Sequence, residues 1–165
     1  MARWSRLGLR YQARWPLQLI FTPEVIAKYN VLFRFLLLLK RVQLELQRQW
    51  AAQSQWAQNR RLMPVWVLRS RMAFFTDTLQ YFIQLDVLDL QFHRLCDAIR
   101  GSDGHGGSRD FEQIRAAHEA YLGALLSQCF LSTPMVGGIV RHILELCLQF
   151  CQATVCLGPK IGWWW

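Results

Sequence analysis

The stretch from Tyr29 to Trp50, YNVLFRFLLLLKRVQLELQRQW, constrains the fold of this 165-residue chain more than any other. It follows a strong helix start, Thr22-Pro23-Glu24, which places a capping hydroxyl before a proline and a carboxylate. Nothing from there to about Gln58 breaks a helix. Apolar residues recur at spacings of three and four and define one helical face: Leu32, Phe35, Leu39, Val42, Leu46 and Trp50. Neighbouring apolar residues widen that face until the middle is apolar nearly all round, which is typical of a helix buried by several neighbours.

The same stretch is too short and too basic to cross a membrane. A transmembrane helix needs about twenty mainly apolar residues. The uninterrupted run here extends from Phe35 to Leu39, between Arg34 and Lys40-Arg41, so no transmembrane segment is predicted. A helix in the membrane interface is harder to exclude, because such helices combine bulky apolar and basic residues. Against it, the apolar surface is too broad for a helix that keeps one face in water.

Three further helices are predicted. The second follows NRRLMP and runs to about Arg100, the third begins near Asp110, and the fourth begins at Thr133-Pro134 and stops at Leu157-Gly158-Pro159. The core-facing residues expected on the second helix are Leu68, Met72, Phe75, Leu79 and Phe82, followed by Tyr81, Leu85, Leu88, Phe92, Leu95 and Ile99. Those expected on the third are Ile114, His118, Leu122, Leu125 and Cys129, and those on the fourth are Ile139, Ile143, Leu146 and Phe150.

The amino-terminal residues fit two templates. Apolar residues alternate from Leu7 to Trp15, which is typical of a half-buried strand. Arginines also recur at helical spacing with no acidic residue before Glu24, as in a mitochondrial presequence. Periodicity alone does not separate the two. The fold class predicted from the whole chain is all-α, a bundle of about four long helices with a short amino-terminal strand or extended segment.

The net charge of +8 is unevenly placed. Residues 1–71 hold 13 Lys and Arg against 2 acidic residues, whereas residues 72–165 hold 6 against 9. A basic first half indicates either a solvated face or an acidic partner, whether protein, nucleic acid or lipid headgroup. Nucleic-acid binding is not predicted, because the basic residues are sparse and no binding-module signature accompanies them.

Residues that could carry chemistry are few. The five cysteines are odd in number and no secretory signal is evident, so we expect free thiols in a reducing compartment. Cys147 and Cys151, with His142 a turn earlier, do not complete a zinc site, and no cofactor is predicted. His118 lies on an apolar face, where a hydrogen-bonded core histidine is favoured over a catalytic or pH-sensing one. Without a phosphate loop or a catalytic triad pattern, we expect no enzyme.

Three ordered blocks resemble the carboxy-terminal domain of the gamma-tubulin complex component family, most closely its component 4 members. They are LGLRYQARWPLQLIFTPEVIAKYNVLFRFLLLLKRVQLELQRQW, LRSRMAFFTDTLQYFIQLDVLDLQF and RDFEQIRAAHEAYLGALLSQCFL. The resemblance implies an all-helical, non-enzymatic domain that holds gamma-tubulin in an assembly that templates microtubule nucleation. It implies gamma-tubulin and other complex components as partners. It also implies a place in the cytoplasm and cytoskeleton, at microtubule-organising centres such as the centrosome and spindle pole.

The resemblance predicts a partial gamma-tubulin-binding domain over residues 1–159 and an atypical tail over residues 160–165. Family members have an amino-terminal half that makes lateral contacts, and they continue with further helices where this chain has GPKIGWWW. We therefore expect a truncated bundle with exposed apolar faces and without lateral assembly.

The leading hypothesis is a gamma-tubulin-binding fragment whose basic first half faces an acidic tubulin surface. Charge and helical face, and no family motif, select the candidate contacts: Arg34, Lys40, Arg41, Arg48, Arg69 and Arg71. Two alternatives stay open. One is a membrane-surface or organelle-targeted helical protein that uses the arginine-rich start and the tryptophan-rich end. The other is a truncated gene product without independent function.

Overall fold

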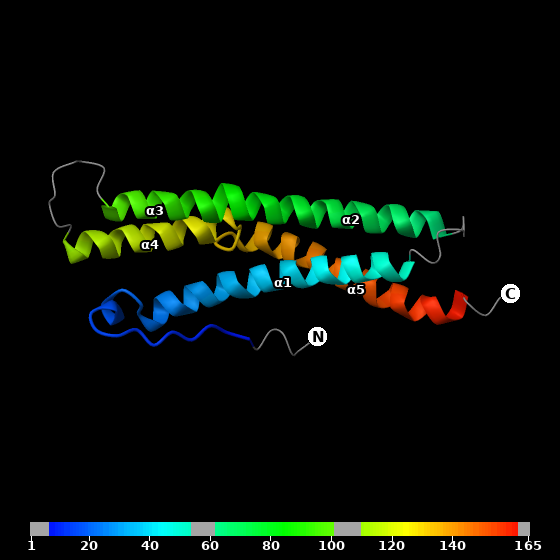
Figure 1. Cartoon of the computed structure of the whole chain (residues 1–165), viewed down its shortest axis with the longest axis horizontal. Helices are drawn as coiled ribbons and strands as arrows, with labels where there is room; N and C mark the ends of the chain where they lie inside the picture. Colours follow the sequence, from blue (N-terminus) through cyan, green and yellow to red (C-terminus); the bar gives the residue numbers. More distant parts are fainter. Residues whose placement is uncertain (1–6, 54–61, 101–109, 162–165) are drawn as a thin grey trace. The chain divides into compact units, whose positions relative to one another are not determined.

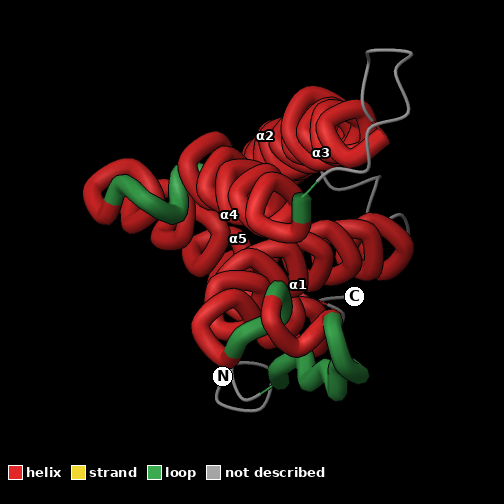
Figure 2. Tube along the Cα trace, turned by 90° about the vertical axis from the view of Figure 1, so that its left-hand side faces the viewer, coloured by secondary structure: helices red, strands yellow, loops and turns green. Residues whose placement is uncertain are grey.

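A computed structural model of the chain describes residues 7–53, 62–100 and 110–161, and these residues are almost entirely helical (Figures 1 and 2). The elements are η2 (Leu17–Leu19), α1 (Pro23–Gln53), α2 (Met63–Tyr81), the π-helical segment η5 (Phe82–Asp89), α3 (Leu90–Arg100), α4 (Phe111–Gln128) and α5 (Pro134–Ile161). Because α2, η5 and α3 follow one another without a break, they form one long helix. The predicted all-α class with four long helices is confirmed.

Residues 7–14 form no strand, and none occurs elsewhere in the described part of the chain. The strand interpretation of the amino-terminal residues is therefore wrong. They form an extended segment that runs alongside the first half of α1 (Figure 1).

The helix starts follow from local sequence. Thr22 Oγ1 accepts a hydrogen bond from the Val25 amide at 3.3 Å, as a capping hydroxyl should. Asp110 precedes α4 as predicted, but its side chain makes no capping bond and its backbone carbonyl accepts from the Gln113 amide instead. The predicted stop at Leu157-Gly158-Pro159 is wrong, because α5 continues to Ile161. Glycine and proline lower helix propensity, but local propensity is a weak guide that context overrides. The predicted end of the first helix near Gln58, the GSDGHGGS loop and the final tryptophans lie outside the described residues.

The chain divides into two compact units. The first comprises residues 1–36 and 81–137, and the second comprises residues 37–80 and 138–165. In the first unit α3 packs along α4, and the buried apolar residues are Val25, Leu32, Phe35, Ile83, Val87, Leu122, Leu125 and Cys129. In the second unit α1 and α5 contribute the buried apolar residues, which are Leu39, Val42, Leu46, Leu144, Cys147, Leu148 and Cys151, and α2 buries Thr76.

The core face predicted for the second helix is partly wrong. Tyr81, Leu85, Phe92 and Ile99 are between 42% and 66% exposed, whereas Ile83, Val87 and Gln91 are buried. The reason is the eight-residue π-helical segment η5, in which each turn takes up about one residue more than in an α-helix. The wider turns rotate residues within and after η5, among them Leu85, Phe92 and Ile99, away from the face that a regular period assigns to them; Tyr81 precedes η5. Leu68 and Trp50, also assigned to core faces, are 45% and 51% exposed.

The face predicted for the fourth helix is wrong for a different reason. Ile139 and Leu146 are exposed, while Leu144, Cys147, Leu148 and Cys151 are buried. Apolar residues occur on both sides of α5, so a 3.6-residue period fits two faces almost equally well. The face predicted for α4 is confirmed, since His118, Leu122, Leu125 and Cys129 are all buried.

Candidate partner-binding surface

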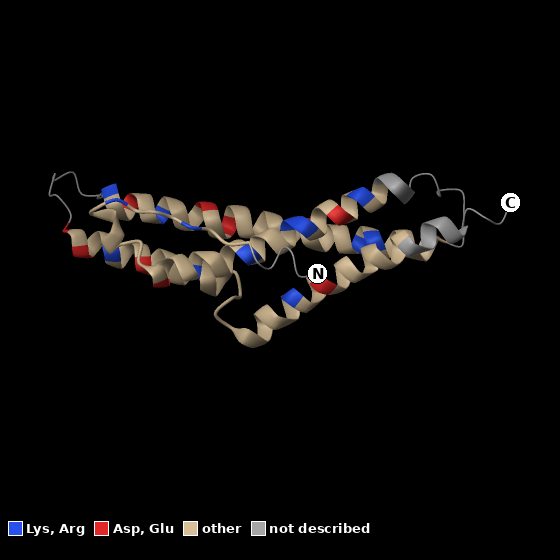
Figure 3. Cartoon of the chain, turned by 90° about the horizontal axis from the view of Figure 1, so that it is seen from below, with Lys and Arg blue, Asp and Glu red and all other residues tan. Residues whose placement is uncertain are grey.

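The six basic residues predicted as contacts fall in both units. Arg34 belongs to the first unit and the other five belong to the second. Basic positions recur along the helices, with acidic positions among them (Figure 3). The six residues differ in the contacts that they make.

Arg34 holds the amino-terminal segment against α1. Its Nε donates to the Leu7 carbonyl at 3.3 Å. One turn earlier on α1, the Asn30 side chain exchanges two hydrogen bonds with Leu9: its Oδ1 accepts from the Leu9 amide at 2.6 Å, and its Nδ2 donates to the Leu9 carbonyl at 3.0 Å. Arg34 is thus engaged in local structure.

Arg69 is also a structural residue. Its guanidinium lies over the Trp50 ring, 4.9 Å from the centroid, and Nη1 donates to the Leu46 carbonyl at 3.5 Å. Trp50 in turn meets Trp66 edge to face with centroids 5.4 Å apart. A cation over an indole face is attracted by the ring quadrupole, so Arg69 helps to join α2 to α1.

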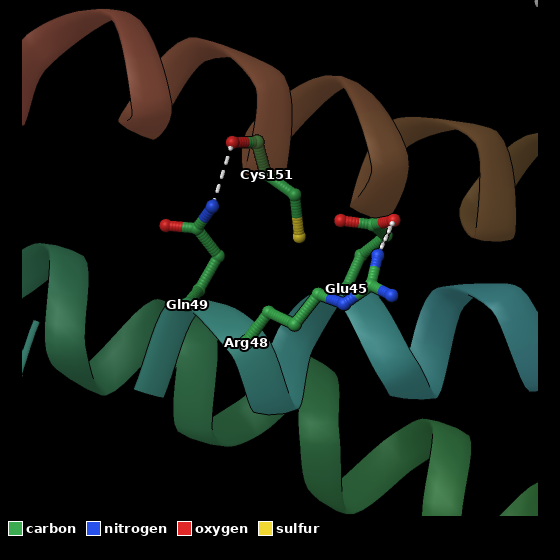
Figure 4. A network of polar contacts seen from close by, with 4 residues as sticks. All are labelled: Glu45, Arg48, Gln49 and Cys151. Carbon is green, nitrogen blue, oxygen red and sulfur yellow. Dashed lines mark hydrogen bonds and ion pairs between the residues drawn. The ribbon is translucent and has the colours of Figure 1, made fainter. Parts of the chain in front are cut away.

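Three of the remaining basic residues present charge to solvent. Lys40, Arg48 and Arg71 are exposed. Lys40 makes a long hydrogen bond of 3.5 Å to Gln43, and Arg48 pairs with Glu45 on its own helix at 3.0 Å (Figure 4). The Arg48 side chain remains 71% exposed, so its charge is still available to a partner. Arg41 is half-buried and already interacts with other groups.

Buried amides and a hydroxyl join the helices of the second unit. Gln49 Nε2 donates to the Cys151 carbonyl at 3.2 Å (Figure 4), and Thr154 Oγ1 lies 3.1 Å from Gln49 Oε1. Gln43 Nε2 donates to Asp77 Oδ1 at 2.8 Å, which joins α1 to α2. Sequence reasoning missed these residues, because a glutamine inside a helix gives no periodic signal of its burial.

In the first unit the buried polar group is one histidine, His118, surrounded by aromatic side chains. His118 is 7% exposed, and its Nε2 lies 2.9 Å from the Tyr29 hydroxyl. The Phe21 ring meets the imidazole edge to face at 5.3 Å, and Tyr121 lies at 6.3 Å. The prediction of a hydrogen-bonded core histidine is confirmed.

Burial sets the protonation states in this cluster. It lowers the pKa of His118 below its ordinary value of 6.5, against an opposing effect of Glu119, and raises the pKa of Tyr29 to about 12. Both groups are therefore neutral at pH 7, and the tyrosine hydroxyl can donate to Nε2. The imidazole proton then resides on Nδ1, which is buried without a hydrogen-bond partner among the described residues.

The four cysteines whose side chains the structure describes have free thiols. Cys129, Cys147 and Cys151 are free and buried, and Cys96 is free and half-buried. Burial raises the pKa of Cys129 and of Cys151 to about 11, which keeps both thiols protonated and weakly nucleophilic. The described residues contain no group of three or more histidine, cysteine and acidic side chains placed to hold a metal ion. None of the helices described here combines the length and the apolar character that crossing a bilayer takes.

These features define a class of protein. They are those of an all-helical module in which buried polar groups join helices and exposed charges lie on helix surfaces. The comparisons with known proteins identify the family. The family described as "Gamma tubulin complex component C-terminal" matches residues 1–159, and the chain belongs to it.

Individual relatives agree with that assignment. The chain is 44% identical over 160 residues to gamma-tubulin complex component 4 of Mus musculus and, equally, to that of Homo sapiens; 94% of this chain and 23% of each relative are covered. It is 37% identical over 167 residues to gamma-tubulin complex component 4 of Arabidopsis thaliana, with 90% and 22% covered. The chain therefore spans less than a quarter of the length of these relatives.

Proposed function

We propose that this chain binds gamma-tubulin as part of a gamma-tubulin complex and so supports microtubule nucleation at microtubule-organising centres. The observation that carries the proposal is the family match over residues 1–159, together with relatives named as gamma-tubulin complex components. A more distant relative, 24% identical, is named as a spindle pole body component of Schizosaccharomyces pombe. The role is that of a non-enzymatic binding domain in the cytoplasm and cytoskeleton, with other complex components as further partners.

The exposed cations of the second unit are the contacts that we propose for gamma-tubulin. Lys40, Arg48 and Arg71 can approach an acidic surface without breaking internal structure, whereas Arg34 and Arg69 hold the chain's own elements. Charges at the rim of an interface raise the association rate and make binding sensitive to salt.

A pull-down with purified gamma-tubulin tests the proposal. We expect the full chain, shown to be folded by circular dichroism and size exclusion, to retain gamma-tubulin at low salt and less of it at physiological salt. The double variant K40E/R71E should weaken retention about tenfold, which corresponds to roughly 1.4 kcal/mol. The matched control is K28E/R94E, the same double reversal at exposed positions of α1 and α3 in the other unit, and it should leave binding nearly unchanged. Absence of retention at either salt, from folded protein, would refute the proposal.

Variants of Arg69 and Arg71 distinguish a loss of stability from a direct loss of binding. They lie two residues apart on α2, but Arg69 contacts Trp50 and Leu46 while Arg71 is exposed. Arg69→Glu should lower the melting temperature and reduce binding only through loss of folded protein. Arg71→Glu should leave the melting temperature within error and reduce binding directly. Loss of stability in both variants would remove Arg71 from the proposed surface.

A further inference from the structure

The amino-terminal segment, residues 7–14, carries no helix or strand, and Leu7 and Leu9 bind it to α1. Leu7 contacts Arg34 and Leu9 contacts Asn30. A step of two residues along the segment therefore covers the same distance as a step of four residues along the helix. Two residues of extended chain span about 6.6 Å, and four helical residues rise about 6 Å. The segment therefore runs antiparallel to α1 in a strand-like conformation, although it pairs with no strand.

Gly8 explains why the apolar side of this segment faces outward. A Cβ at Gly8 would lie 3.0 Å from Asn30 Oδ1, so the absence of a side chain lets the segment approach the helix. In an extended chain successive side chains point to opposite sides. The side chains of Leu7 and Leu9 accordingly point to the side opposite Asn30 and are 46% and 47% exposed, whereas Tyr11, 53% exposed, meets the Phe21 ring edge to face with the centroids 5.1 Å apart. The alternation in the sequence is real, but about half of the surface of each of these three side chains is exposed.

One backbone edge of the segment is open. The Leu9 amide and carbonyl are both bonded to Asn30, and the Leu7 carbonyl is bonded to Arg34. In an extended chain the neighbouring peptide groups point the other way. The backbone groups of Gly8, Arg10 and Gln12 form no hydrogen bond with any described residue. This arrangement is an unpaired strand edge, which is a template for another extended chain.

The charges beside this edge indicate the chemistry of its occupant. Arg10 and Arg14 are exposed, and no acidic residue precedes Glu24 in the sequence. Trp15, 81% exposed, extends the apolar surface. A lipid surface would meet the arginines and the aromatic rings, but hydrocarbon offers no partner to a row of backbone groups. An extended polypeptide satisfies all three features.

We propose that residues 7–12 form a docking edge for an extended segment of a partner protein in which apolar residues alternate with acidic ones. The partner segment adds to this edge as a strand, with its apolar residues against Leu7, Leu9 and Tyr11 and its acidic residues near Arg10 and Arg14. Main-chain hydrogen bonds supply affinity and the alternating side chains supply specificity, as in other strand-addition complexes. This edge lies outside the proposed gamma-tubulin contacts, so either proposal can fail without the other.

The test uses the full chain and a fluorescent, end-blocked peptide of about seven residues in which valine alternates with glutamate. Fluorescence anisotropy should show salt-sensitive binding. A peptide of the same sequence, N-methylated at alternate residues to remove its amide donors, should bind at least about tenfold more weakly. R10E/R14E should weaken binding about tenfold, while K28E/R94E, a matched double reversal at exposed positions of α1 and α3, should change it less than about twofold.

Three outcomes would overturn the proposal. The first is equal affinity for the methylated and unmethylated peptides, which would reduce the interaction to charge. The second is no peptide binding by protein shown to be folded by circular dichroism. The third is capture by vesicles containing phosphatidylserine that R10E/R14E abolishes, with no peptide binding, which would make the segment a membrane contact.

Discussion

The two units place polar groups inside apolar helical cores in different ways. The first unit buries His118, which contacts Tyr29 on α1 and Phe21 before it. The second unit buries Gln43, Gln49 and Thr154, whose amide and hydroxyl groups bridge α1 to α2 and α5. The first arrangement depends on a titratable imidazole, whose Nδ1 has no hydrogen-bond partner among the described residues, whereas the amides and the hydroxyl of the second do not titrate.

This difference indicates which unit is sensitive to pH. Amides and hydroxyls contribute hydrogen bonds that do not change with pH, and they fix the register of the helices that they join. A buried imidazole contributes only while it is neutral, because charging it inside an apolar core is unfavourable. We therefore expect acidification to act on the first unit before the second.

The largest losses of stability should come from substitutions in the apolar cores. Leu122→Ala in the first unit and Leu144→Ala in the second each remove a side chain that is at most 1% exposed. Each should lower the free energy of unfolding by about 2–5 kcal/mol. Native-state hydrogen exchange should show the loss of protection mainly in the unit that carries the substitution. Leu44→Ala, at a 45% exposed position, is the control and should cost far less. Equal loss of protection in both units would remove the distinction between them.

Substitutions at the buried hydrogen bonds of His118 and Gln49 should give the next largest losses of stability, and the two losses should differ. Tyr29→Phe deletes the only hydrogen-bond partner that the described residues provide for the His118 ring, and should cost about 1–3 kcal/mol. Thr154→Val deletes one of several contacts of Gln49, which keeps its bond to the Cys151 carbonyl, so the cost should be about 0.5–1.5 kcal/mol. Urea denaturation of both variants at pH 7.5 measures the difference. A larger cost for Thr154→Val would reverse the comparison.

Acid should destabilise the first unit through His118. Because burial lowers the pKa of His118 in the folded protein below 6.5, the unfolded chain binds the proton more readily. Stability is then fully present above about pH 6.5 and falls as the pH drops, until the folded-state pKa is passed. One proton limits the slope to about 1.4 kcal/mol per pH unit. Urea denaturation between pH 7.5 and 5.5 should show this decline in the wild-type chain.

The control for this pH effect is His118→Gln, which keeps an acceptor for Tyr29 but cannot titrate. Its stability should be nearly flat over the same range, since carboxylates titrate mostly below it. A decline of equal size in His118→Gln would locate the pH dependence elsewhere.

The sequence predicted the four helices, the start of α1 at Thr22-Pro23, and the burial of His118, because capping chemistry and periodicity act locally. It did not predict which face of the second helix is buried beyond Tyr81, because the π-helical segment changes the period there. It assigned the wrong face to α5, because two faces are apolar. Sequence selected the candidate contacts by charge, but only packing shows that Arg34 and Arg69 are engaged in local structure.

The smallest effect should come from the surface pair Arg48–Glu45. The two side chains are 71% and 34% exposed and lie three residues apart on α1. Exposed helical pairs of this kind contribute only a few tenths of a kcal/mol, so Glu45→Gln should change the melting temperature very little.

The same substitution leaves the Arg48 charge unpaired, and gamma-tubulin binding should then rise slightly at low salt if Arg48 is a contact. Salt titration of the pull-down measures this, with Glu112→Gln as the control, because Glu112 pairs with Arg115 in the first unit at 2.9 Å. Equal changes in both variants would mean that Glu45 acts through net charge alone, and Arg48 would lose its place in the proposed surface.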